Sequence, residues 1–322
     1  MHTQTSTTET LRWTHLTADS VEQWAELTNL LATVDGTEEF YEAEDLAEEL
    51  EEPGFTPETD SWAVWDADRL IAYGQLRVAS NLDDEGRVSA RLGGGVHPDW
   101  RERGIGRDLV RRMEARAREL SDERHPGAPV IFRASGELEG SPARRLFTHL
   151  GYAVVRYFND LARPVPGDPL SVPEIDGVEL TTPTDDHEEA VRLAHTAAFA
   201  DHWGSSPGTA EGWHGYWTSR SSRREVSTLA LDGDGEVLAY VLTSQWVPRE
   251  LYVTIVGTVP QARGRGIAAA CLARTLRLAA ESGEYDVVEL TVDSESLTGA
   301  TRLYERLGFT LARTTASMQK DA

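Results

Sequence analysis

The chain has 322 residues, 40% of them hydrophobic, and carries a formal net charge of −23. This length and hydrophobic content allow a large buried core and favour two domains over one. The acidic excess argues against nucleic acid and anionic membranes as partners, because both would repel the protein at long range. One cysteine, Cys271, excludes a disulfide within these residues, and we expect a small buried side chain there rather than a reactive thiol.

Neither a membrane span nor a signal peptide is predicted. No run approaches the roughly 18 apolar residues that a span needs, and the stretch "MHTQTSTTETLRW" has neither a basic nor an apolar region. We therefore expect a cytoplasmic protein that makes no membrane contact.

In the first half, the acidic run "EEFYEAEDLAEELEEPG" (residues 38–54) predicts a solvated helix, with a binding face as the less favoured alternative. Apolar patterns predict strands within 61–78, 87–96 and 129–135. Helical spacing predicts a long helix over 104–120 and a short one around Phe147.

A linker follows in "RPVPGDPLSVPEIDG" (163–177), whose four prolines cannot sustain a helix or a central strand. We place a first domain at 1–165, the linker at 166–176 and a second domain at 177–322. The second half repeats the element order of the first, which predicts an α/β fold with mixed sheets flanked by helices. Its expected elements are a helix at 188–203, a hairpin at 227–245, a strand at 250–259, a helix at 264–283, a strand at 286–293, a helix at 298–308 and a strand at 309–318.

The two halves carry matching motifs. "PDWRERGIGRDL" (98–109) aligns with "PQARGRGIAAAC" (260–271), so that Arg101 matches Arg263. "RRLFTHLGY" (144–152) aligns with "TRLYERLGF" (301–309) at a similar distance along the chain. Two motifs that recur in the same order at nearly the same offset indicate a duplicated domain.

A strand that turns into a helix at residue 260 leaves the first helical N–H groups without partners, and these groups attract anions. Gly264 and Gly266 would let a ligand approach the backbone, and Arg263 and Arg265 are suited to phosphate oxygens. A pyrophosphate is the expected ligand. No paired-histidine motif is present and "DGDG" (232–235) lacks the spacing of a calcium loop, so we predict no metal.

At these residues the sequence resembles the GNAT acetyltransferase superfamily, whose signature is [QR]-x-x-G-x-[GA]. Both Arg263-x-x-Gly266-x-Ala268 and Arg101-x-x-Gly104-x-Gly106 fit it, and "LYERLGF" is similar to the closing element of that fold. The tandem arrangement looks most like that of the mycothiol synthase-like actinobacterial members.

The resemblance implies that each half binds acetyl-coenzyme A, with its pyrophosphate on the signature loop. It also implies that the preceding strand separates from its neighbour and holds the pantetheine arm through backbone groups. The implied cofactor residues are Val256, Thr258, Arg263, Gly264, Arg265, Gly266, Ile267 and Ala268 in the second half, and Gly94, Val96, Arg101, Arg103, Gly104 and Gly106 in the first.

The resemblance further implies that Tyr304 donates a proton to the departing thiolate, whereas Phe147 stands at that position in the first half. The second domain is therefore expected to be catalytic, and the first to be degenerate, either as a cofactor-binding or as a structural relic. Glu250 is a candidate general base, although a charged strand end is the commoner explanation. Asp201 and His202 are candidates for substrate contacts or for a capped turn.

These inferences predict an acetyl-CoA-dependent N-acetyltransferase that acts by direct transfer on the primary amine of a small molecule. A cationic amine is favoured because the protein is acidic, and the tandem domains are compatible with a monomer. A non-catalytic acetyl-CoA sensor or scaffold, and a protein N-acetyltransferase, stay open as alternatives.

Overall fold

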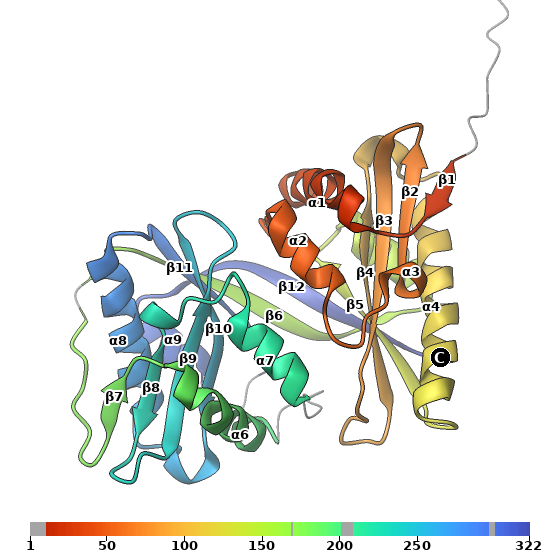
Figure 1. The fold of residues 1–322 in the computed structure, drawn as a ribbon. Helices are drawn as coiled ribbons and strands as arrows, with labels where there is room; N and C mark the ends of the chain where they lie inside the picture. Colours follow the sequence, from red (N-terminus) through yellow and green to blue (C-terminus); the bar gives the residue numbers. More distant parts are fainter. Residues whose placement is uncertain (1–10, 169, 201–208, 296–299) are drawn as a thin grey trace, which may run out of the picture.

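The computed structural model describes residues 11–168, 170–200, 209–295 and 300–322. Figure 1 shows the two halves side by side. The first half contains β1 (Arg12–Thr14), α1 (Val21–Asp35), α2 (Ala43–Leu50), α3 (Pro57–Asp60), β2 (Ser61–Asp66), β3 (Arg69–Val78), β4 (Val88–Val96), α4 (Ile105–Arg124), β5 (Val130–Glu137), α5 (Pro142–His149) and β6 (Ala153–Pro164). The second half contains β7 (Glu179–Thr181), α6 (Glu188–Ala198), α7 (Ala210–Thr218), β8 (Thr228–Leu231), β9 (Val237–Ser244), β10 (Glu250–Thr258), α8 (Ile267–Ser282), β11 (Val287–Asp293), α9 (Ala300–Arg306) and β12 (Thr310–Asp321).

The predicted α/β class is confirmed, but the strands form one continuous mixed sheet rather than one sheet per half. Its order is β1-β2-β3-β4-β5-β12-β6-β11-β10-β9-β8-β7. Within it, β4 runs parallel to β5 and β10 runs parallel to β11, while the other neighbours are antiparallel.

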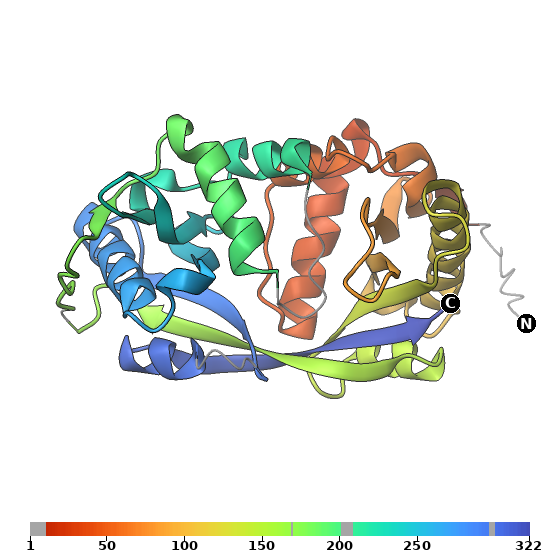
Figure 2. The ribbon, with the colours of Figure 1, turned by 90° about the horizontal axis from the view of Figure 1, so that it is seen from below.

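The two halves are joined because their last strands are shared. β12 pairs with β5 of the first half, and β6 pairs with β11 of the second half. The two long strands also pair with each other, from Thr310 opposite Ala162 to Gln319 opposite Ala153. Figure 2 shows β6 and β12 running together beneath both halves, so each closing strand completes both parts of the sheet.

Helices cover both faces of the first half. α4 packs on one face through Leu109 and Met113, whose side chains lie against Gly74 of β3. α1 and α2 cover the other face, where Trp24 is fully buried and meets Tyr73 with ring centroids 5.7 Å apart. The second half has one large core, in which Cys271 is buried as expected.

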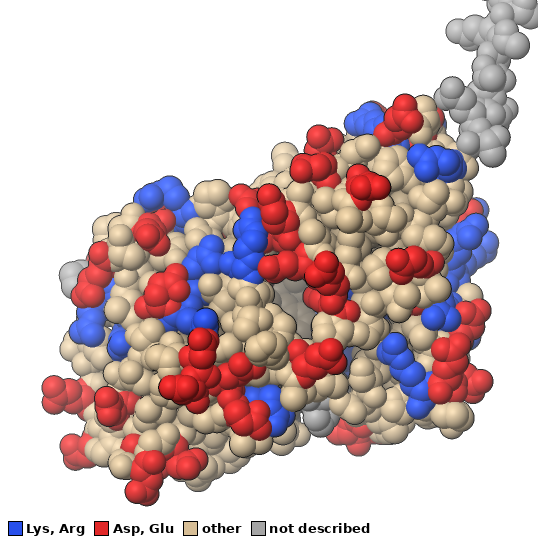
Figure 3. Space-filling view, viewed as in Figure 1, with Lys and Arg blue, Asp and Glu red and all other residues tan. Residues whose placement is uncertain are grey.

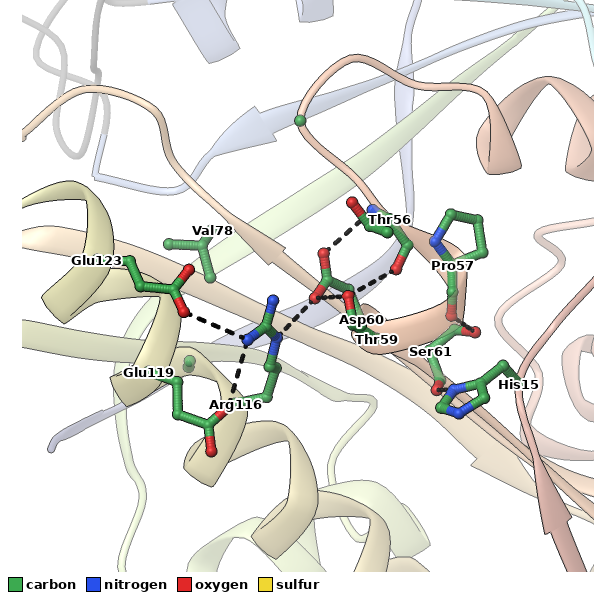
Figure 4. A network of polar contacts seen from close by, with 12 residues as sticks. His15, Thr56, Pro57, Thr59, Asp60, Ser61, Val78, Arg116, Glu119 and Glu123 are labelled. Atoms are coloured by element: carbon green, nitrogen blue, oxygen red, sulfur yellow. Dashed lines mark hydrogen bonds and ion pairs between the residues drawn. The ribbon is translucent and has the colours of Figure 1, made fainter.

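A polar network ties α4 to the edge of the first half (Figure 4). Arg116 of α4 donates from Nε to Oδ1 of Asp60 at 2.9 Å, and it also pairs with Glu119 and Glu123. Asp60 is 2% exposed and accepts a second bond from the backbone N–H of Thr56. A buried carboxylate with these partners fixes α3 against α4.

The acidic run differs from the predicted solvated helix. Only Ala43–Leu50 is helical, and Leu46 is buried against α1. Its acidic side chains reach the second half: Arg220 forms ion pairs with Glu42, Glu44 and Asp45. Packing against two neighbours, which a single-helix pattern does not reveal, explains the difference.

The other predicted helices and strands are present, with ends shifted by a few residues. In the described part of the chain, no helix is both long and apolar enough to cross a membrane.

Candidate active site

The two signature loops have the same backbone form. Each follows a single 3-10 turn, and Gly104 and Gly266 take left-handed conformations with φ of 86° and 79° as they begin α4 and α8. Two residues earlier, Gly264 has φ 77°, and its counterpart Glu102 has φ 62°. A Cβ at Gly264 or Gly266 would meet nothing within 4 Å, so these glycines leave the backbone open to a ligand.

The signature arginines hold the loops in place. Arg101 donates from Nε to the Val96 carbonyl at 3.0 Å and binds both carboxylate oxygens of Asp35 at the end of α1. Arg263 donates from Nη2 to the Ala198 carbonyl at the end of α6, at 2.8 Å. Each arginine therefore connects the loop to the first long helix of its half, and some of its N–H donors are already used in these contacts.

The strand before each loop separates from its parallel neighbour. Pairing of β4 with β5 runs only from Val88 to Leu92, and pairing of β10 with β11 runs only from Glu250 to Tyr252. Residues 93–96 and 255–258 keep their partners on the other side. Val256, Thr258, Gly94 and Val96 therefore lie on strand segments that lack a β5 or β11 partner, where an extended ligand can pair with the backbone.

Tyr304 lies in α9 with 7% of its surface exposed. Its ring packs edge-on against Phe309 at 5.9 Å, and burial raises its pKa to about 12. The group is therefore a protonated phenol at neutral pH. Phe147, its counterpart in α5, packs the same way against Tyr152 at 5.0 Å.

Glu250 is the first residue of β10 and is partly buried. Burial, then the nearby carboxylate of Glu289, raises its pKa to about 7, although Arg313 acts in the opposite direction. Val88 and Phe132 hold the positions that correspond to Glu250 and Glu289 in the first half. A carboxyl group that titrates near neutrality is suited to accept a proton.

The first half contains a cavity of about 980 Å³ beside its signature loop. We call it the first-half cavity. Basic residues line it at the loop, the start of α4 and α5, and acidic residues line it from the α1–α2 segment, the loop and β5. The basic set comprises Arg101, Arg103, Arg107 and Arg145, and the acidic set comprises Asp35, Glu39, Glu49, Glu102 and Glu137.

Glu39 and Glu49 lie in the acidic run that was predicted to be solvated, and no motif in the sequence singles out Glu137 of β5. Burial raises the pKa of Glu39 to about 7, with Glu137 and Asp160 adding to the shift. Figure 3 shows the surface hollowed between the halves, with acidic side chains around the hollow. Carboxylates therefore lie beside the signature loop of the first half and around the hollow between the halves.

The remaining predicted residues are placed as follows. A Cβ at Gly106 would lie 3.1 Å from Leu146. Ile267 and Ala268 lie in the first turn of α8, and Ile267 is buried. Arg103 stacks on Trp100 at 4.5 Å, and Arg265 is exposed. Asp201 and His202 lie outside the described residues.

The model of the acetyltransferase (GNAT) family matches residues 189–309, and the acetyltransferase (GNAT) domain model matches residues 57–154. Mycothiol acetyltransferase of Mycolicibacterium paratuberculosis is 32% identical over 270 residues, which cover 76% of each chain. The chain belongs to the GNAT acetyltransferase family.

Other relatives agree with this assignment. Mycothiol acetyltransferase of Salinispora arenicola is 32% identical over 228 residues, or 66% of this GNAT chain and 67% of that protein. A GCN5-related N-acetyltransferase from Sphaerobacter thermophilus has a TM-score of 0.75 at 25% identity, covering 97% of this chain and 95% of that one. A tandem GNAT protein from the clavulanic acid biosynthesis pathway has a TM-score of 0.68 at 21% identity over 97% and 98%, which shows the fold alone.

The GNAT membership confirms the resemblance seen in the sequence and makes the protein an acyltransferase that uses acetyl-CoA. The chain fits this cofactor, because a left-handed glycine at the start of the helix and a separated strand occur together in both halves, and the loop glycines of the second half are open to a ligand. The roles of single residues, and the boundaries at 165 and 177, stay predictions.

Proposed function

We propose that the second half transfers the acetyl group of acetyl-CoA directly to the primary amine of a small molecule. The observation that carries this proposal is the presence of a neutral buried phenol, Tyr304, and of a carboxyl group of raised pKa, Glu250, at positions where the first half has Phe147 and Val88. One can give a proton and the other can receive one, as direct transfer to an amine requires.

Each proposed role follows from position. Arg265 and the backbone N–H groups at 264–268 hold the pyrophosphate, and Val256 and Thr258 pair with the pantetheine arm. Glu250 accepts the ammonium proton, directly or through water, so that the neutral amine can attack the thioester carbon. As the C–S bond breaks, Tyr304 protonates the thiolate, and the second proton that the attacking nitrogen loses restores the phenol, so the products are the amide and the free thiol of coenzyme A.

We propose that the first half holds acetyl-CoA in the first-half cavity without turning it over. Its loop and strand geometry support binding. Phe147 and Val88 in place of Tyr304 and Glu250 remove the proton donor and the proton acceptor. The division into domains at 1–165 and 177–322 belongs to this proposal.

For the acceptor, we propose a cationic amine. The carboxylates around the hollow between the halves favour a positive charge by simple attraction. Asp201 and His202 are proposed as contacts of this acceptor. A mycothiol-type amine is a second candidate, favoured by the names of the relatives. We propose that the protein works in the cytoplasm, as a monomer.

The test is release of coenzyme A from acetyl-CoA by the purified full chain, measured across a panel of small amines and peptides. Saturable release with a small cationic amine supports the proposal. Release only with peptides would instead favour a protein N-acetyltransferase. Acetyl-CoA binding without release for any amine would favour a sensor or scaffold.

A further inference from the structure

Three arginines lie in a row across the first half of the sheet. Arg77 of β3 is directly opposite Arg91 of β4, and Arg91 is directly opposite Arg133 of β5. Partners in register point to the same face, and neighbouring strands lie only about 4.8 Å apart. We call Arg77, Arg91 and Arg133 the arginine row.

The row lies on the sheet face that α1 and α2 cover. Arg77 donates from Nη2 to the Glu49 carbonyl of α2 at 3.1 Å. Tyr73 precedes Gln75 by two residues and Arg77 by four, so the three side chains share one face of β3. On that face, Tyr73 lies against Trp24 of α1. The opposite face is filled by α4, so the row belongs to the side that holds the acidic part of the first-half cavity.

Like charges at directly opposite positions destabilise a sheet unless counter-charges offset them. Arg77 has such a partner, because its Nε donates to Glu52 at 2.8 Å. Arg133 is 8% exposed and lies 3.9 Å from Asp83, a carboxylate that also pairs with Arg87 at 3.0 Å. These carboxylates interact with Arg77 and Arg133, and Arg91 adds a further positive charge directly beside them.

Arg91 is exposed and has no ion pair within the part of the chain that the structure describes. Burial, and then the charge of Arg91, lowers the pKa of Arg133. In a chain of net charge −23, two guanidinium groups held together in this way attract an anion.

The row also borders a groove of about 520 Å³. Its floor is formed by β4 and β5, and its far wall is formed by Phe158 of β6 and Thr315 and Ser317 of β12. The hydroxyl groups of Thr315 and Ser317 add neutral donors to the charged ones. The groove shares Glu49, Gln75, Gly93 and Ser135 with the first-half cavity, so the two spaces adjoin.

We propose that this groove is an anion-binding site, in which Arg91 and Arg133 hold a carboxylate or phosphate group of a small molecule. Guanidinium groups suit such oxyanions because their N–H donors form a planar fork. The oxyanion is either free or part of a zwitterion whose amine lies toward the carboxylates of the first-half cavity.

The test is calorimetric titration of the full chain at constant ionic strength, with inorganic phosphate, glutarate and glutamate as probes. We expect saturable binding of at least one probe, weakened about tenfold by Arg91→Gln because one charge-assisted contact is lost. Arg111→Gln is the matched control, because Arg111 is exposed on α4 across the sheet. It should leave binding unchanged.

The probes also separate the two sources of the oxyanion. Glutamate bound more tightly than glutarate indicates a zwitterion, whereas phosphate bound best indicates a free anion. No saturable binding of any probe, or equal binding by wild type and Arg91→Gln, overturns the proposal. These readouts are independent of turnover, so they can fail without affecting the proposed acetyl transfer.

Thermal unfolding without an added anion excludes a folding defect. Arg91→Gln should unfold at the same temperature as wild type or higher, because it reduces repulsion within the arginine row. Its affinity for acetyl-CoA should stay unchanged. A lower unfolding temperature would mean that Arg91 stabilises the fold, and this result too would contradict the proposal.

Discussion

The phenol ring of Tyr304 meets the ring of Phe309 edge-on, with their centroids 5.9 Å apart. The first half repeats this contact with the residue types exchanged, since Phe147 lies in the helix and Tyr152 in the segment that follows. The Tyr152 hydroxyl donates a hydrogen bond to Oε1 of Glu114 at 3.0 Å. The same aromatic packing thus leaves a phenol at the proposed proton-donor position in one half only.

Tyr304→Phe should therefore lower kcat by about 100-fold, the usual contribution of a positioned proton donor. The ring keeps its packing, so the Kd for acetyl-CoA and the unfolding temperature should hardly change. Steady-state kinetics and calorimetry measure the two effects separately. The matched control is Tyr152→Phe, which should cost about 1 kcal/mol of stability and leave kcat unchanged. Equal kcat for wild type and Tyr304→Phe would remove Tyr304 from the mechanism.

The pKa of Glu250, raised to about 7, predicts the pH dependence of the enzyme. A general base acts when it is ionised, so kcat/KM should rise with pH and level off above about pH 7. Glu250→Gln should lower the plateau and abolish this rise. Glu39 titrates in the same range, so Glu39→Gln is the control and should keep the rise. If Glu39→Gln removes the rise and Glu250→Gln does not, Glu250 is not the base.

Glu39 also predicts a pH dependence of stability. Its pKa is raised in the folded protein, so the folded state binds more protons than the unfolded state between about pH 4.5 and 7. Its contribution to stability is present below that range and is lost as the pH rises through it. Glu39→Gln should therefore raise the urea midpoint at pH 8 more than at pH 5. A larger gain at pH 5 would contradict this sign.

The loop residues Gly264 and Glu102 share a left-handed backbone that only the glycine adopts without strain. Gly264→Glu should therefore cost about 1 kcal/mol of unfolding free energy and weaken acetyl-CoA binding about tenfold, by placing a carboxylate beside the phosphates. Gly283→Glu is the control, because Gly283 has φ 69° at the other end of α8. It should show the stability loss without the loss of binding.

Much of this architecture could be predicted from the sequence. The signature loops, the duplication and the strand and helix order follow from local patterns, because turn glycines and apolar periodicity depend on neighbouring residues. The pairing of β12 with β5 could not be predicted in this way. β6 and β12 are repeats of each other, so the sequence does not distinguish which half each strand completes.

The acidic residues of the first-half cavity could not be predicted for a similar reason. Glu39 and Glu49 belong to a run that is typical of a solvated helix, and only tertiary packing turns them toward a cavity. The row of Arg77, Arg91 and Arg133 depends on strand register, which spans 56 residues of sequence between its ends. By contrast, Tyr304 and Glu250 could be singled out, because both lie at positions defined by recognisable elements.

Arg313 interacts with several carboxylates at the junction of the two halves. Its Nε donates to Asp160 of β6 at 2.8 Å, it also pairs with Glu38, and it lies 3.8 Å from Glu289 of β11. It also lowers the pKa values of Glu39 and Glu250, which burial raises. Both the stability of the junction and the titration of the proposed base therefore depend on this one cation.

Arg313→Gln should cost about 3 kcal/mol at pH 8, where carboxylates with little solvent exposure would be left without their partner. The loss should shrink toward pH 5, because Glu289, whose pKa is raised by burial, then takes up a proton. The rise in kcat/KM should move to higher pH, since the pKa of Glu250 would no longer be lowered by this cation. Arg220→Gln, which removes a more exposed inter-half cation, should cost less than about 1 kcal/mol and leave the pH profile in place. An unmoved profile in Arg313→Gln would mean that the titrating base lies away from this junction.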